Sequence, residues 1–136
     1  MRRIWIAAAI CLTGIGAAAD GAPSPGWEDL REQYLPGGEV RFDQTLRLMT
    51  PDKVEQSFQV PVIVKLGADL GRIEELVVIA ENNPIQQVVR IHPHERLESV
   101  GLNIRLEMST PVHTAARTAD GVWHVASKSV LVPPSM

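Results

Sequence analysis

The sequence predicts an all-β fold, an antiparallel β-sandwich preceded by one short helix. Short apolar, β-branched segments separated by turn residues recur over about a hundred residues, which is typical of such sandwiches. The apolar residues Leu102, Ile104, Leu106 and Met108 alternate with polar residues, as expected for a half-buried strand. Asp120-Gly121 stands between two further strand-like segments and indicates a β-hairpin.

The helix is predicted over residues 27–35, because Trp27, Leu30 and Tyr34 recur at helical spacing on one face. Pro36-Gly37-Gly38 then ends it. Such a stripe can bind a partner, but more often it packs on its own domain, which is the interpretation we favour.

The remaining chain divides into about seven predicted strands. Pro61 lacks a backbone N–H and suggests that its strand is an edge strand or contains a bulge. Asn82-Asn83-Pro84 is a strong turn signal. The predicted strands cover residues 42–49, 58–66, 73–80, 85–91, 102–108, 112–118 and 122–132.

The hairpin register follows from taking Asp120 and Gly121 as a two-residue turn, so that Arg117 faces His124. Trp123 then points into the core beside Val125, Val78, Ile104 and Leu106. His113 and His124 share the opposite face, about 13 Å apart, which is too far for one metal ion.

The first residues have the pattern of an export signal. Arg2 and Arg3 precede an apolar stretch, residues 4–15, that is too short to span a membrane, and Ala17–Ala19 suits a signal peptidase. We expect a signal peptide over residues 1–19, a flexible leader over 20–26, one domain over 27–136, and a periplasmic location. The adjacent arginines leave Sec and twin-arginine export both open, and an uncleaved helix is a further alternative.

Cysteine content and charge exclude several classes of function. The only cysteine, Cys11, lies in the expected signal, so the mature chain would have no thiol for a disulfide or a covalent intermediate. The net charge of −3 becomes about −5 without Arg2 and Arg3, which argues against nucleic acid or an anionic membrane as partner.

No residue pattern predicts catalysis or a cofactor. Ser99, Ser109, Ser127 and Ser129 lack a nucleophile-elbow context, and the adjacent carboxylates of Glu74 and Glu75 are expected to point to opposite faces of a strand. His92 and His94 are the candidate metal ligands, with Glu95 or Glu98 as a third, although a solvated loop with two surface histidines is the favoured interpretation.

Several segments together resemble the immunoglobulin-like domain of the SoxY family, the substrate-carrier subunits of the periplasmic thiosulfate-oxidising system. The resemblance covers residues 27–132 and rests on segments 27–30, 60–64, 73–84, 103–106, 112–116 and 120–123. It implies an immunoglobulin-like sandwich and pairing with a SoxZ-like subunit.

The resemblance also implies a C-terminal Gly-Gly-Cys-Gly-Gly arm, whose cysteine carries the sulfur substrate. This sequence has Pro133-Pro134-Ser135-Met136 at that place, so no active residue is carried over. Prolines are stiff where the glycines of such an arm are mobile.

We therefore expect an exported SoxY-like binding or assembly subunit that is not an enzyme. Its partner would be a SoxZ-like subunit or a periplasmic oxidoreductase, and a homodimer is also possible. The alternatives are a true sulfur carrier and a periplasmic metal-binding module that uses His92 and His94. The strand over residues 58–66 is the expected edge for the partner.

Overall fold

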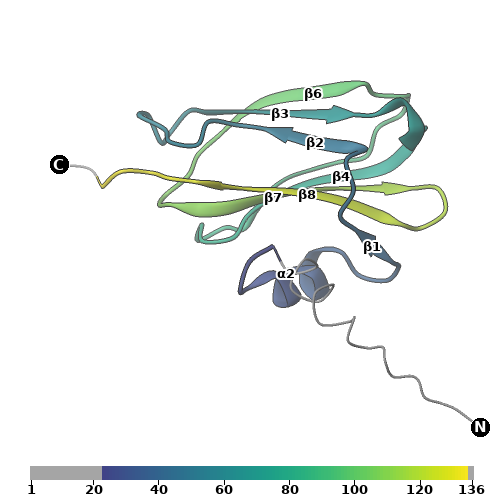
Figure 1. Ribbon diagram of the computed structural model, residues 1–136, viewed down its shortest axis with the longest axis horizontal. Helices are drawn as coiled ribbons and strands as arrows, with labels where there is room; N and C mark the ends of the chain where they lie inside the picture. Colours follow the sequence, from purple (N-terminus) through teal and green to yellow (C-terminus); the bar gives the residue numbers. More distant parts are fainter. Residues whose placement is uncertain (1–22, 135–136) are drawn as a thin grey trace, which may run out of the picture.

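The computed structural model describes residues 23–134, which form two β-sheets packed face to face with one helix outside them (Figure 1). The larger sheet has the strand order β1-β8-β7-β4-β5 and the smaller one β2-β3-β6. The predicted all-β sandwich with a short N-terminal helix is therefore confirmed. The expected export signal with Cys11, and residues 20–22 of the expected leader, lie outside the described residues.

The elements follow one another along the chain as α2 Trp27–Tyr34, β1 Val40–Arg41, β2 Leu46–Met49, β3 Val60–Leu66, the 3₁₀ turn η2 Ala68–Leu70, β4 Ile73–Ala80, β5 Gln87–Ile91, β6 Ser99–Ile104, β7 Thr110–Thr118 and β8 Trp123–Val130. Strand partners are antiparallel except for β1, which runs parallel to β8. Among these residues no helix is long and apolar enough to cross a membrane.

Helix α2 packs on the outer face of the five-stranded sheet, away from the smaller sheet (Figure 1). Trp27 and Leu30 are buried, so the stripe predicted from sequence packs on its own domain. Leu35 closes the last turn by donating its N–H to the carbonyl of Arg31. Gly37 and Gly38 then adopt positive φ angles, as the predicted helix stop requires.

The molecule has two apolar cores, one on each side of the five-stranded sheet. Strand β4 is buried on both faces, which explains its nearly continuous apolar sequence. Leu76, Val78 and Ala80 belong to the core between the sheets, whereas Val77 and Ile79 belong to the core under α2. We call the second of these the helix-side core; its buried members are Trp27, Leu30, Leu35, Val77, Ile79, Ala115, Trp123 and Val125.

The β7–β8 hairpin differs from its prediction by one residue in register. Thr118 donates its N–H to the carbonyl of Val122, and Arg117 pairs with Trp123 rather than with His124. The loop is therefore residues 119–121, with Gly121 at φ 84°, which matches the three-residue hairpin that ends in a left-handed glycine.

A one-residue shift moves every side chain of a strand to the other face. Trp123 is buried with Val125, as predicted, but it lies in the helix-side core, whereas Val78, Ile104 and Leu106 belong to the core between the sheets. His113 pairs with Ser127 and shares its face with Trp123, while His124 lies on the opposite face. The prediction that the two histidines share a face is therefore wrong.

Strand β3 is the central strand of its sheet, so the prediction of an edge strand at residues 58–66 is wrong. Pairing with β2 stops at Met49 and Ile63, before Pro61 is reached. The carbonyl of Pro61 accepts a bond from the Thr50 hydroxyl on the β2 side. In a strand, the nitrogen and the carbonyl of one residue point to the same side. The nitrogen of Pro61, which carries no hydrogen, therefore points to the β2 side at a position where no strand is paired.

The alternation predicted over residues 102–108 is present, although β6 itself covers Ser99–Ile104. Leu102 is half-buried, and Ile104 and Leu106 are buried between the sheets. Met108, which was expected to point inward, is largely exposed because it lies beyond the end of the strand.

Candidate functional site

A chain of hydrogen bonds links Ser127 on β8, His113 on β7 and Glu81 just after β4. His113 Nδ1 lies 2.6 Å from Ser127 Oγ, and His113 Nε2 lies 3.0 Å from a carboxylate oxygen of Glu81. Glu81 also accepts bonds from the Ser24 hydroxyl and from the N–H of Gly26. The network therefore joins the N-terminal segment to the sheet.

The electrostatics of this network favour a neutral imidazole beside an ionised carboxylate. His113 is only 1% exposed, and burial lowers its pKa below the ordinary value of 6.5 although the bond to Glu81 opposes this. Burial raises the pKa of Glu81, but the hydrogen bonds from Ser24, His113 and Gly26 outweigh it and hold the pKa below 4.5.

Sequence reasoning missed this network because it placed His113 on the wrong face of the hairpin. With the observed register, His113 and Ser127 stand directly opposite each other. Ser127 has no nucleophile elbow, since it lies in the middle of β8. Its proximity to a histidine depends on cross-strand pairing, which the local sequence around Ser127 does not reveal.

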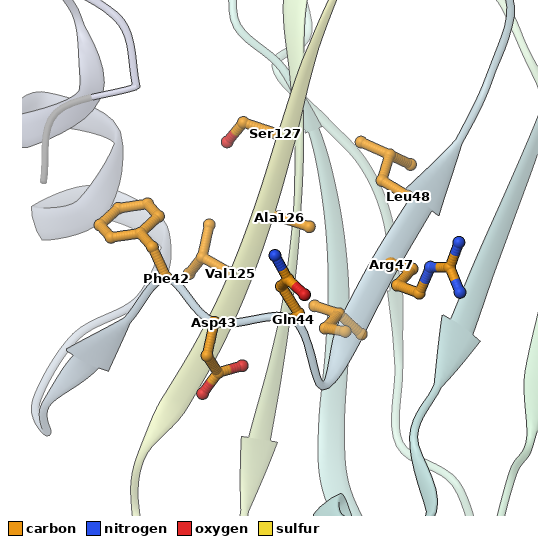
Figure 2. A pocket seen from close by; sticks show the side chains of 9 residues that line it. Phe42, Asp43, Gln44, Arg47, Leu48, Val125, Ala126 and Ser127 are labelled. Atoms are coloured by element: carbon orange, nitrogen blue, oxygen red, sulfur yellow. The ribbon is translucent and has the colours of Figure 1, made fainter. Parts of the chain in front are cut away.

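A cavity of about 740 Å³ opens beside Ser127 at the free edge of β8 (Figure 2). We call it the lateral pocket; it is lined by Phe42, Asp43, Gln44, Leu46, Arg47, Leu48, Val125, Ala126 and Ser127. It forms where the chain leaves β1 and crosses to β2 in the other sheet. Strand β1 pairs with β8 only at Trp123 and His124, and the next partner of β8 on this side is Lys53, at Leu131.

His124 contacts the same crossing from the inner face of the sheet. Its Nδ1 lies 2.8 Å from a carboxylate oxygen of Asp43. The Asp43 carboxylate also accepts bonds from the N–H and the hydroxyl of Thr45. These contacts hold the chain between β1 and β2 and so shape the mouth of the lateral pocket.

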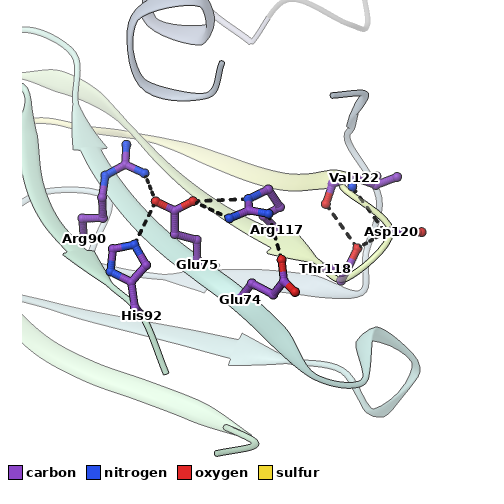
Figure 3. Close-up of polar contacts among 8 residues, drawn as sticks. All are labelled: Glu74, Glu75, Arg90, His92, Arg117, Thr118, Asp120 and Val122. Atoms are coloured by element: carbon purple, nitrogen blue, oxygen red, sulfur yellow. Dashed lines mark hydrogen bonds and ion pairs between the residues drawn. The ribbon is translucent and has the colours of Figure 1, made fainter. Parts of the chain in front are cut away.

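A second polar cluster surrounds Glu75 on β4 (Figure 3). One carboxylate oxygen of Glu75 accepts bonds from Arg117, at 3.0 and 3.2 Å, and the other contacts Arg90. Arg90 also donates to the carbonyl of Tyr34 at 2.7 Å. The cluster therefore fastens three strands to the end of α2.

Glu74 and Glu75 converge on the same guanidinium, so the prediction that they do not converge is wrong. Arg117 Nη1 lies 2.8 Å from Glu74, while its other nitrogens contact Glu75. The pairing of β4 with β7 shifts register between Ile73 and Glu75. Such a bulge breaks the strict alternation of side chains.

The arginines keep Glu75 ionised even though its side chain is only 12% exposed. Burial raises the pKa of Glu75, but the hydrogen bonds and charges of Arg90 and Arg117 prevail and set it below 4.5. Arg90 and Arg117 each make three hydrogen bonds within the protein, so the cluster acts as a structural clamp.

His92 and His94 follow the end of β5 at Ile91, so they do not continue a strand with a shared face. The imidazole of His92 is 64% exposed, and its Nε2 lies 3.2 Å from Glu75. Within residues 23–134 no group of three or more His, Cys, Asp and Glu side chains could hold a metal ion. A metal site at His92 and His94, with Glu95 or Glu98, stays a prediction.

The outer face of the small sheet carries an apolar row without a covering element among the described residues. Met49, Ile63 and Gly101 are paired across β2, β3 and β6, and the two large side chains are 43% and 40% exposed. Arg47 and Lys65 form the adjacent row of the same face. We call this surface the open sheet face.

The end of the domain is tied to the rest of the fold. Leu131 donates its N–H to Asp52 and accepts a bond from the N–H of Val54. Ser109 bonds both the N–H and the carbonyl of Val132. Pro133 and Pro134, the first two residues at the position expected for a carrier arm, come directly after Val132. Ser135 and Met136 lie outside the described residues.

Comparison with known proteins finds a family model and several solved structures that match the chain. The family model described as "Sulfur oxidation protein SoxY" matches residues 31–133. The solved sulfur carrier protein SoxY from Chlorobium limicola f. thiosulfatophilum is similar at TM-score 0.68 and 16% identity, over 79% of this chain and 96% of that one. No curated protein matches the sequence.

A superoxide reductase (neelaredoxin) from Ignicoccus hospitalis is also similar, at TM-score 0.53 and 21% identity, over 66% of this chain and 81% of that one. At these identities the solved structures show a shared fold. The family match covers most of the chain and is therefore the stronger finding.

Proposed function

Because the chain belongs to the SoxY family of sulfur oxidation proteins, we propose that it is a binding or assembly subunit of a periplasmic sulfur-oxidation system. In this role the domain pairs with a SoxZ-like subunit or a periplasmic oxidoreductase and performs no sulfur-oxidising turnover of its own. The observation that carries the proposal is the position of Cys11, which precedes the family-matched residues 31–133.

The described domain has the family scaffold but no thiol to load. Covalent carriage by a SoxY arm needs a cysteine, and residues 12–136 contain none. We therefore assign the domain a role in recognition and assembly. The second candidate function is a true sulfur carrier, favoured by the similarity to the solved sulfur carrier protein SoxY.

Intact-mass spectrometry separates these two functions. The exported protein is incubated with thiosulfate and the oxidising enzymes of the system, and its mass is compared with that of the untreated protein. We expect no adduct. A sulfur adduct on the mature chain would establish the carrier function instead.

Export is part of the proposal and has its own test. We expect signal cleavage after Ala19 and recovery of the protein from the periplasmic fraction. Mass measurement of the recovered chain defines its first residue. A chain that keeps its first 19 residues in the cytoplasm would contradict the location.

We propose the open sheet face as the surface for the partner. A buried interface needs an apolar centre, which Met49 and Ile63 supply. The neighbouring Arg47 and Lys65 favour a partner with acidic groups at its rim. On the outer face of the other sheet, α2 already packs against β4, β7 and β8.

Gly101 provides a probe of this surface that should leave the fold intact. A Cβ added at Gly101 meets no atom within 4 Å, so there is open space above it. We expect Gly101→Arg to weaken partner binding at least tenfold, about 1.4 kcal/mol, in a pull-down or titration with the SoxZ-like subunit. The control is Ile85→Glu, which changes an exposed apolar residue between β4 and β5 of the other sheet. Equal binding by Gly101→Arg and the wild type would remove the open sheet face from the interface.

A further inference from the structure

Ser127 is an exposed residue whose hydroxyl is hydrogen-bonded to a buried imidazole. Its Oγ lies 2.6 Å from His113 Nδ1. Ser129, two residues further along β8, is also exposed but faces Pro111. The two serines therefore differ in whether a base stands opposite.

The direction of each hydrogen bond follows from the charge of Glu81. An ionised carboxylate only accepts hydrogen bonds, so His113 Nε2 carries the proton that lies in the 3.0 Å contact with Glu81. Nδ1 is then the unprotonated nitrogen, and it accepts the hydroxyl proton of Ser127. Either ring nitrogen can act as a base when the other is fixed in this way.

The base is held rigidly. His113 is packed against Trp27, with the ring centroids 5.1 Å apart. Glu81 is itself held by Ser24 and Gly26. A base oriented by a third group is the arrangement that activates serine nucleophiles.

The lateral pocket gives an electrophile access to Ser127. Trp123 and Leu131 direct their N–H groups to the free edge of β8, toward Glu39 and Asp52. The pairing of β7 with β8 is continuous from Trp123 to Val130. Because the direction of the N–H groups repeats every second residue along a strand, the N–H of Ser127 points to the same edge as that of Trp123. Phe42, Leu46 and Leu48 supply apolar walls.

We propose that Ser127 is an activated nucleophile that accepts the acyl group of a small activated ester bound in the lateral pocket. Ser127 Oγ forms a bond to the carbonyl carbon while its proton passes to His113 Nδ1. The bond to the leaving alcohol breaks, the leaving oxygen takes that proton, and an acyl-serine remains. No oxidant or reductant is needed. In this step Glu81 is a positioning residue.

The test uses p-nitrophenyl acetate with the mature protein. We expect one acetyl group per chain, located on Ser127 by peptide mass spectrometry, and release of one equivalent of p-nitrophenol. Ser127→Ala removes the nucleophilic oxygen and should lower the rate at least a hundredfold. Ser129→Ala is the matched control and should react like the wild type.

The positioning role of Glu81 is tested by the protonation of His113, which a purely structural role of Glu81 would leave unchanged. We expect the ¹⁵N signals of His113 to report a proton on Nε2 in the wild type. In Glu81→Gln, folded by circular dichroism, we expect an altered Nδ1 signal and acetylation at least tenfold slower. Absence of acetylation, acetylation of Ser129 at an equal rate, or no effect of Ser127→Ala would overturn the proposal.

Discussion

Arg117 and Trp123 face each other directly across the β7–β8 hairpin, and the guanidinium carbon of Arg117 lies 5.6 Å from the centroid of the indole ring. The same guanidinium binds Glu74 and Glu75. Arg117 therefore joins the helix-side core to the Glu75 cluster. Contacts of a cation with an aromatic ring contribute about 0.5–1 kcal/mol at sites of this kind.

Trp123→Ala should lower the free energy of unfolding by about 3–5 kcal/mol, because a large aromatic side chain only 1% exposed is removed from the helix-side core. Urea unfolding followed by circular dichroism measures this. Trp123→Phe is the control and should cost less than Trp123→Ala, because the phenyl ring leaves a smaller cavity. The indole N–H of Trp123 has no hydrogen-bond partner within residues 23–134, so replacement by Phe loses no hydrogen bond. Equal costs for the two variants would contradict this account.

The hairpin shows how far sequence reasoning reaches in this fold. The apolar and polar alternation located β7 and β8 and predicted that Trp123 is buried. Asp120-Gly121 fits both a two-residue loop and a three-residue loop that ends in glycine. The local sequence does not choose between them, and the choice decides which face holds His113.

The edges of the sheets were not predictable for a related reason. Pro61 excludes a paired N–H on one side of its strand, but it does not say how far the neighbouring strand extends. In the structure β2 simply stops before Pro61 is reached. Strand order depends on contacts between residues far apart in the chain, and the pattern within a single strand does not encode those contacts.

The candidate site was the least predictable part because it is assembled from distant segments. Glu81, His113 and Ser127 lie on three separate stretches of the chain, and only the pairing of β7 with both β4 and β8 brings them together. By contrast, the family resemblance was confirmed because it depends on the order of segments, which the sequence displays directly.

Glu75→Ala should destabilise the protein by about 1–3 kcal/mol, because two partly buried guanidinium groups lose a shared acceptor. Glu74→Ala is the matched control, since its carboxylate contacts the same Arg117 but is 46% exposed. An exposed pair of this kind contributes at most about 1 kcal/mol. Thermal and urea unfolding of both variants provide the comparison. A larger loss for Glu74→Ala than for Glu75→Ala would refute the clamp.

Gly38→Ala should destabilise the fold by about 1–3 kcal/mol. Gly38 has φ 96°, and a Cβ there would lie 2.3 Å from the carbonyl oxygen of Gly121. Gly101→Ala is the control, because its Cβ enters open space, and we expect a change within about 0.5 kcal/mol. Comparison of the two unfolding midpoints decides the matter, and equal midpoints would show that the approach of Gly38 to Gly121 is not constrained.

Stability should fall as the pH drops below about 6.5, because His113 has a lower pKa in the folded protein than in the unfolded chain. In this range the unfolded chain binds more protons than the folded one, so protonation favours unfolding, by at most about 1.4 kcal/mol per pH unit for one group. Glu81 and Glu75 add a second loss below 4.5, where their carboxylates would have to be protonated.

Urea unfolding between pH 8 and 5 measures this dependence. His113→Gln separates the contribution of His113 from that of the other histidines. Its overall stability should be lower, but the slope of the unfolding free energy between pH 6.5 and 5 should be shallower than in the wild type. A wild-type protein that grows more stable as the pH falls from 7 to 5.5 would show that His113 is not held neutral by its burial beneath Trp27.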